Sequence, residues 1–164
     1  MRSIPLRIEA LMAAEETSDD LVIGVAEVGH LTWKQRLDLT ACIECGRCDD
    51  ACPAHAADGR LSPRRLIADL KLLRDREGLP AIIGAEGTVF EDADFVWLCR
   101  TCHACQSLCP AAIEHVDLFF ELRRSEVLMA GRLPKEAGQA LKTMETQGNP
   151  FGAQADRMDF VKRL

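Results

Sequence analysis

Tyrosine is absent from this sequence of 164 residues, and aromatic residues make up only 5% of it. Strands of β-sheet proteins are enriched in aromatic and β-branched residues, so this scarcity argues against a β-sandwich. Hydrophobic residues nevertheless reach 48% of the sequence, which is enough to build the core of one domain. The composition therefore predicts a mainly α-helical protein.

Long apolar runs are also missing. No stretch approaches 18 consecutive apolar residues, so the sequence predicts no membrane span. The N-terminal segment has no long apolar run and no twin-arginine pair, and it soon becomes acidic, so no export signal is expected. We expect a cytoplasmic protein, which a partner could hold at the inner face of the membrane. The formal net charge of −6 argues against nucleic-acid binding.

All eight cysteines fall in two runs of one pattern, Cys-x2-Cys-x2-Cys-x3-Cys-Pro, at residues 42–53 and 99–110. This is the bacterial ferredoxin pattern, in which three closely spaced cysteines bind one 4Fe-4S cluster and the fourth binds the other. The sequence therefore predicts two 4Fe-4S clusters with crossed ligands. The expected ligands are Cys42, Cys45, Cys48 and Cys109 for the first cluster, and Cys99, Cys102, Cys105 and Cys52 for the second.

Three other uses of the cysteines are less consistent with this pattern. A disulfide framework would normally accompany an export signal, and its spacing would be less regular. Structural zinc would account for paired Cys-x2-Cys units but not for the third cysteine or for the final Cys-Pro. A 3Fe-4S cluster would be indicated by a missing ligand, and no ligand is missing.

Four neighbours of the cysteines are candidates for the environment of the clusters. Pro53 and Pro110 follow the last cysteine of each run, where they turn the chain and remove an N–H donor. His103 and His115 could donate hydrogen bonds near a cluster, or they could be ordinary surface residues. Because every cysteine is already used, no catalytic nucleophile is expected, and the chain is predicted to be non-catalytic.

Two helix starts are indicated by the residues that precede them. Thr32 is a good N-cap, and Gln35 stands three residues later at the spacing of a capping box. Ser62 followed by Pro63 is an N-cap followed by proline at the first helical position. We therefore expect a short helix leading into the first cysteine run and an amphipathic helix over residues 63–76, which Gly78 and Pro80 should end.

Two further helices are predicted after the second cysteine run. Residues 114–129 should form one, with a broad apolar face made by Val116, Phe119, Phe120, Val127 and Leu128. Pro134 should begin the other, and residues 148–150 should end it. The apolar stretch at residues 21–25 could be a short extended segment.

The two runs and their flanking segments resemble the dicluster iron–sulfur module in the C subunit of heterodisulfide reductase. The same module occurs in the anaerobic glycerol-3-phosphate dehydrogenase iron–sulfur subunit and in membrane-bound iron–sulfur oxidoreductases linked to electron-transfer flavoprotein and quinone. The resemblance extends over about residues 30–152, and the segments that carry it are 32–35, 39–42, 113–117 and 148–152. It implies an α-helical ferredoxin fold.

The resemblance also implies a place in a multisubunit oxidoreductase. The chain would relay single electrons between a flavoprotein subunit and a cysteine-rich subunit with a Cys-Cys motif, which is catalytic or reduces quinone. This chain has no Cys-Cys pair of its own. The expected organisation is an N-terminal arm at 1–30, the dicluster domain at 31–130, and a C-terminal helix and tail at 131–164 for partner docking.

Two other functions stay open at this point. The chain could be a free, soluble ferredoxin that carries electrons among several enzymes, or a cluster-dependent sensor. The two cysteine runs occupy only 24 of the 164 residues, and a carrier would need few more. The long flanking segments therefore favour a subunit of a complex.

Overall fold

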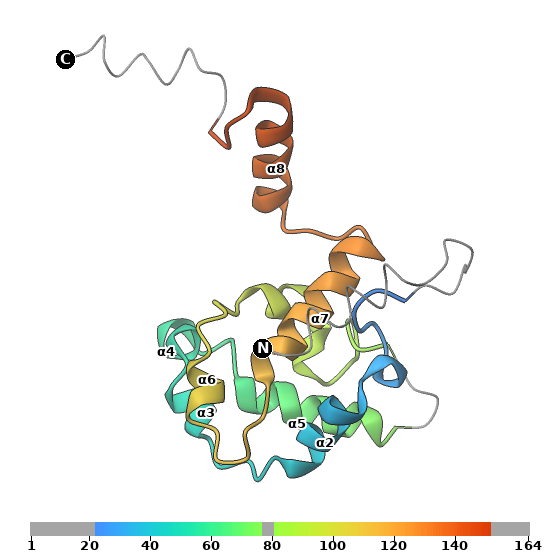
Figure 1. The fold of residues 1–164 in the computed structure, drawn as a ribbon, viewed down its shortest axis with the longest axis vertical. Coiled ribbons are helices and arrows are strands. Elements are labelled where there is room, and N and C mark those ends of the chain that lie inside the picture. The colour runs from blue at the N-terminus through green and yellow to red at the C-terminus, as the bar shows by residue number, and fades with distance from the viewer. Residues whose placement is uncertain (1–21, 77–80, 152–164) are drawn as a thin grey trace, which may run out of the picture. The chain divides into compact units, whose positions relative to one another are not determined.

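The computed structural model describes residues 22–76 and 81–151, and its regular structure there is helical (Figure 1). A single β-bridge, between Glu27 and Ala81, is the only strand-like pairing in this part of the chain. The predicted mainly α fold class is confirmed. None of the helices in the described part is long and apolar enough to cross a membrane. The chain divides into two compact units, Met1–Ala130 and Gly131–Leu164.

The first unit contains six α-helices and three short 3-10 helices within the described residues. The α-helices are α2 (Trp33–Ala41), α3 (Arg47–Asp50), α4 (Pro53–Asp58), α5 (Pro63–Arg74), α6 (Ala104–Ser107) and α7 (His115–Leu128). The 3-10 helices are η1 (Val28–His30), η2 (Val89–Glu91) and η3 (Ala93–Trp97). Three of the α-helices, α3, α4 and α6, lie within or directly after the cysteine runs and were not predicted.

Both predicted helix starts are confirmed. The Thr32 hydroxyl accepts a hydrogen bond from Gln35 N at 3.3 Å, and the Gln35 side chain accepts one from Thr32 N at 2.9 Å, which completes the capping box of α2. Ser62 Oγ accepts from Arg65 N at 3.1 Å, and Pro63 is the first residue of α5. Residues 78 and 80, which were expected to end this helix, lie outside the described part of the chain.

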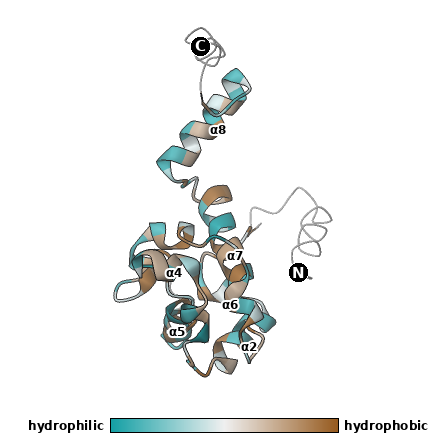
Figure 2. Cartoon of the chain, turned by 90° about the vertical axis from the view of Figure 1, so that its left-hand side faces the viewer, coloured by the Kyte–Doolittle hydropathy of each residue, from teal (hydrophilic) through white to brown (hydrophobic). Residues whose placement is uncertain are grey.

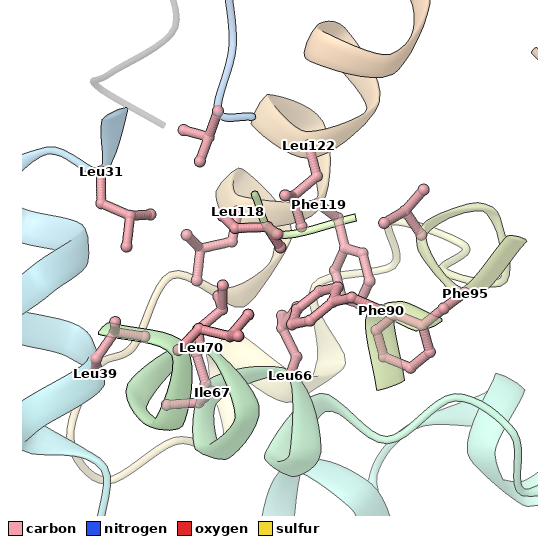
Figure 3. Close-up of a cluster of buried hydrophobic side chains, with 14 of the residues drawn as sticks. Leu31, Leu39, Leu66, Ile67, Leu70, Phe90, Phe95, Leu118, Phe119 and Leu122 are labelled. Carbon is pink, nitrogen blue, oxygen red and sulfur yellow. The ribbon is translucent and has the colours of Figure 1, made fainter. Parts of the chain in front are cut away.

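The core of the first unit lies between α5 and α7 (Figure 3). Leu66, Ile67 and Leu70 of α5 are fully buried against α7, which contributes Leu118, Phe119 and Leu122. Phe95 packs edge-on to Phe90 at 5.7 Å between ring centroids and lies 5.9 Å from Phe119. The interface between these two helices therefore holds α7 in place directly after the second cysteine run.

The predicted apolar face of α7 was partly wrong. Val116 and Phe119 are buried, but Val127 and Leu128 are exposed at 36% and 60%. The last turn of α7 lies beyond the core, so periodicity alone did not identify where burial stops. Leu118 and Leu122, which were left out of the predicted face, are the residues that complete it.

The segment before η1 packs against α7 instead of forming a strand. Val25 N donates to Glu121 O at 3.1 Å, and Val25 and Val28 are both about 1% exposed in the core. These residues fall in the part expected to be an N-terminal arm. Val25 and Val28 nevertheless contribute to the core of the domain. Residue 21, at the start of the expected extended segment, lies outside the described residues.

The second unit contains α8 (Lys135–Gln147), which follows Pro134 as predicted. Gly148 ends it in the left-handed conformation, with φ of 70°. Hydrophobic and hydrophilic residues alternate along this helix (Figure 2). Leu141 and Met144 are both more than half exposed. The unit thus carries an amphipathic helix with an exposed apolar face.

Candidate iron–sulfur site

The two cysteine runs have the same backbone conformation. Glu44 and Thr101 occupy equivalent positions in the two runs, and both have φ of 54°. Two positions further on, Gly46 and His103 are again both left-handed, with φ of 82° and 62°. A four-residue helix follows in each case, α3 in the first run and α6 in the second. Two left-handed residues turn each loop tightly, so its three closely spaced thiols can point toward one space.

The first space is a cavity that is partly open to solvent. Four cysteines line it: Cys42, Cys45, Cys48 and Cys109. Two of the predicted neighbours, Pro110 and His115, also line this cavity, as does Arg64. Three thiols from the first run and the last thiol of the second run therefore surround one cavity.

The second space is a similar cavity, also partly open to solvent. The cysteines that line it are Cys52, Cys99, Cys102 and Cys105. The other predicted neighbours, Pro53 and His103, lie at this cavity, together with the apolar side chains of Val116 and Phe119. The second cavity thus has the complementary set of thiols, three from the second run and one from the first.

One thiol from each set packs in the same apolar cluster, together with Val116. Cys48, from the first cavity, and Cys105, from the second, belong to a single apolar cluster with Val116 of α7, and Phe120 packs against it. All three residues of this cluster are less than 10% exposed. The interior between the two cavities is therefore apolar and close-packed.

All eight thiols are free, but they differ in burial. Burial raises the pKa of Cys48 to about 11 and that of Cys105 to about 12. It also raises the pKa of Cys42 and Cys99. A thiolate, not a thiol, binds metal, so a bound metal has to offset the cost of deprotonating these buried groups.

Backbone N–H groups of the loops are directed at the first thiol of each run. Thr101 N donates to Cys99 Sγ at 3.4 Å, and this bond counteracts the effect of burial on the pKa of Cys99. Glu44 N has the same effect on the pKa of Cys42. The left-handed residues therefore orient donors toward sulfur, an arrangement that stabilises negative charge on a thiolate.

The two histidines occupy different environments. His115 is only 1% exposed, and its Nδ1 lies 3.1 Å from Ile113 O, so Nδ1 carries the proton that is donated to this carbonyl. Burial lowers the pKa of His115, which favours the neutral imidazole. His103 lies at the start of α6, and its Nδ1 forms a short hydrogen bond with Gln106 Oε1. His115 is thus part of the interior, whereas His103 stabilises the second loop.

Sequence reasoning missed the charged residues around the cavities. Asp49 is buried beside Cys48, and its carboxylate accepts hydrogen bonds from Arg64 N and Nε at 3.0 and 3.2 Å. Arg123 of α7 donates to Cys99 O at 2.6 Å. No spacing relation in the sequence connects Arg123 with the second cysteine run, because tertiary packing alone brings them together.

The donor set fits iron–sulfur clusters better than it fits a single ion. Within residues 22–76 and 81–151, no three His, Cys, Asp or Glu side chains converge closely enough to hold one metal ion. Each group of four thiols instead lines one shared space. A cluster held by four separate thiolates needs such a space between them.

Comparison with known proteins identifies the domain. Residues 38–113 match the family model described as "4Fe-4S dicluster domain". This segment contains both cysteine runs. The chain therefore contains a 4Fe-4S dicluster domain, which carries two 4Fe-4S clusters, and the predicted cofactors are confirmed.

Several curated proteins are similar to most of the chain. A "Probable membrane-anchored ferredoxin" of Chromohalobacter salexigens is 33% identical over 167 residues, covering 89% of this chain and 25% of that protein. The "EtfAB:quinone oxidoreductase" of Syntrophomonas wolfei is 31% identical over 157 residues, covering 79% of this chain and 22% of that protein. This chain thus spans about a quarter of the length of these relatives.

A shorter relative matches the module named from the sequence. It is the C subunit of the ferredoxin/F(420)H(2)-dependent CoB-CoM heterodisulfide reductase of Methanosarcina acetivorans, which is 37% identical over 109 residues. The match covers 66% of this chain and 59% of that relative. The resemblance to this heterodisulfide reductase module and to quinone-linked iron–sulfur oxidoreductases is therefore confirmed.

Proposed function

We propose that this chain is the electron-transfer part of a multisubunit oxidoreductase. In this proposal it relays single electrons between a flavin-containing partner and a cysteine-rich partner that is catalytic or reduces quinone. It makes and breaks no substrate bonds itself. The observation that carries the proposal is that each of two neighbouring cavities is lined by four thiols, contributed by both cysteine runs.

The proposed ligands follow the lining of the two cavities. Cys42, Cys45, Cys48 and Cys109 would hold one cluster, and Cys99, Cys102, Cys105 and Cys52 the other. When bound, the clusters would supply one-electron transfer. The protein would position them on either side of Val116 in an apolar interior, and the crossed ligands would join the two halves of the domain.

The exposed thiols indicate where electrons could enter and leave. Cys45 and Cys102 are exposed, whereas Cys48 and Cys105 are buried near the centre. Each cavity thus has one ligand at the surface and one toward the other cavity. This arrangement supports a relay with two openings, because partners could approach both ends.

The proposed partners rest on the family resemblance, which implies a flavoprotein and a cysteine-rich subunit. One relative is named as an oxidoreductase of EtfAB and quinone, and another as part of a heterodisulfide reductase, and both names support partners of an electron-transfer complex. Residues 131–164 are proposed to dock one of the partners. The exposed Leu141 and Met144 of α8 support a docking role. A relative named as a membrane-anchored ferredoxin supports a location at the membrane surface, which we propose is reached through a partner.

Anaerobic purification of the native protein with its partners tests this function. We expect about eight irons per chain and two interacting S = 1/2 EPR signals after reduction. Flavoprotein and cysteine-rich subunits should co-purify. Zinc in place of iron would overturn the proposal, and a monomer that purifies alone with eight irons would favour a free electron carrier.

A further inference from the structure

Arg123 places a fixed positive charge next to the second set of thiols. Its Nε donates to Val96 O at 2.8 Å, and its Nη2 donates to Cys99 O at 2.6 Å. The guanidinium carbon lies 5.3 Å from the centroid of the Trp97 ring. The side chain is thus held by two carbonyls and an aromatic face, all of them in the segment that leads into Cys99.

The charge of Arg123 is only partly screened by solvent. Arg123 is half-buried, and burial lowers its pKa, while the neighbouring Cys99 has the opposite effect. An arginine nevertheless stays protonated in proteins. Because screening by salt and water is weaker for a half-buried charge than for an exposed one, its field should reach the second cavity.

Among the residues that the structure describes, the first cavity has no counterpart of Arg123. The residue 57 positions before Arg123 is Leu66, which is fully buried in the apolar core. Two cations, Arg47 and Arg64, do line the first cavity, but Glu44 lines it as well. Arg64 is also bonded to Asp49 at 3.2 Å, so the charges around this cavity nearly cancel.

Charges at the second cavity have one sign. Arg100 lines it, and no acid does among the lining residues that the structure describes. Arg123 adds a second, more buried positive charge behind Cys99. Asp58, which lines another pocket together with Arg100, pairs with Arg60 at 3.1 Å.

We propose that Arg123 gives the cluster held by Cys99, Cys102, Cys105 and Cys52 a higher reduction potential than the other cluster. Reduction adds one negative charge to a cluster, and a nearby cation stabilises this charge more than it stabilises the oxidised form. An electron that enters the module therefore resides mainly at the second cavity. The inference rests on the ligand sets of the proposed function.

The transfer implied by this difference involves one electron and no atoms. The centre held at Cys42 would lose the one electron that the centre held at Cys99 would gain, and no proton or ligand would be exchanged. An electron that enters at the first cavity would thus move to the second, the more favourable site, and be delivered from there.

An EPR-monitored redox titration of the full chain tests this role. At a fixed potential, Arg123→Gln should lower the ratio of reduced to oxidised centre in the higher-potential step about tenfold. This change corresponds to a midpoint potential that is about 59 mV lower, for transfer of one electron. The lower-potential step should move much less. Arg123→Lys, which keeps the charge, should leave the potential of the higher step close to that of the wild type. Arg76→Gln is the matched control, since Arg76 is an exposed arginine that donates to a carbonyl, Glu86 O at 3.4 Å, and lines neither cavity.

The outcomes separate this inference from the proposed function. If the wild type does not contain about eight irons, the proposed function fails. If the iron content is full in every variant and the higher step stays in place in Arg123→Gln, only the role of Arg123 fails. Equal shifts in Arg123→Gln and Arg123→Lys would also overturn it, because the effect would then come from packing and not from charge.

A second pair of variants tests the order of the potentials without changing Arg123. Cys45 and Cys102 are the exposed thiols of the two sets, so their removal should disturb the fold least. Cys102→Ala should remove the higher-potential step, and Cys45→Ala should remove the lower one. The reverse assignment would contradict the proposal.

Discussion

Ser62 Oγ donates one bifurcated hydrogen bond to the two carboxylate oxygens of Asp49, at 2.9 and 3.0 Å. This contact joins the first cysteine run to the N-terminus of α5. Asp49 also accepts from Arg64 N and Nε, and it is only 7% exposed. One buried carboxylate therefore holds the loop that presents three thiols to the first cavity.

Asp49→Ala should lower the free energy of unfolding by about 3 kcal/mol, because it leaves buried donors without their charged acceptor. Chemical denaturation of the cluster-loaded protein measures this change. The neighbouring Asp50 is exposed, and Asp50→Ala should change stability by no more than about 0.5 kcal/mol. Equal effects of the two substitutions would show that the Asp49 contacts do not stabilise the loop.

Gly24 lies directly against the backbone of α7. A Cβ atom at this position would lie 2.4 Å from Glu121 O and 2.5 Å from Ser125 N, and φ is 80°. Gly24→Ala should therefore lower the free energy of unfolding by about 3 kcal/mol or more, from the clash and the left-handed conformation together.

Gly84→Ala is the matched control for Gly24. Gly84 also has a left-handed backbone, with φ of 88°, but a Cβ atom there would meet nothing within 4 Å. This variant should lose only about 1 kcal/mol, the cost of the conformation alone. If thermal or urea unfolding gives the same loss for both variants, the close approach of Gly24 to α7 does not contribute to stability.

His115 should make the stability of the protein dependent on pH. Its pKa lies below the ordinary value of 6.5, chiefly because of burial. The unfolded state therefore binds more protons than the folded state between the lowered pKa and about 6.5, so the free energy of unfolding should fall as the pH drops through this window. Above about pH 7 the contribution should be constant.

His115→Gln should remove this part of the pH dependence. Urea unfolding at several values between about pH 7.5 and 5.5 provides the comparison. The variant should show a smaller loss of stability toward acid pH than the wild type. Identical slopes for the two proteins would mean that the imidazole is not held neutral in the folded state.

The fold could be predicted where the sequence has local signals. The starts of α2 and α5 were correctly located because Thr32, Ser62 and Pro63 act on the backbone within three residues. The start of α8 after Pro134 and its end at Gly148 follow from the same kind of local rule. Local signals at the helix ends therefore account for the prediction of α2, α5 and α8, whereas α7 was predicted from its apolar periodicity.

Other features depend on tertiary packing and had no such signal. Val127 and Leu128 are apolar but exposed, because α7 extends past the core that its first three turns cover. Glu44 and Thr101 are left-handed without being glycine, so their residue types do not reveal the turn that their loops make. The short helices α3 and α6 follow from these turns, which explains why sequence periodicity missed them.

The candidate site, too, could be predicted from the sequence only in part. The spacing of the cysteines was sufficient to predict the number and type of clusters, since this chemistry needs thiolates at fixed steps. The cations and the carboxylate around the cavities were not predictable. Arg123 reaches Cys99 O across 24 residues, and Asp49 reaches Ser62 across 13, through contacts that only the packed helices create.

Iron counting in two double variants tests the crossed ligands most directly. If Cys52 serves the same cluster as Cys99, then Cys52→Ala combined with Cys99→Ala should lose one cluster and keep about four irons per chain. Cys52→Ala combined with Cys42→Ala should lose both clusters and keep almost no iron. The reverse result, with iron retained in the Cys52 and Cys42 double variant and lost in the other, would contradict the crossed arrangement.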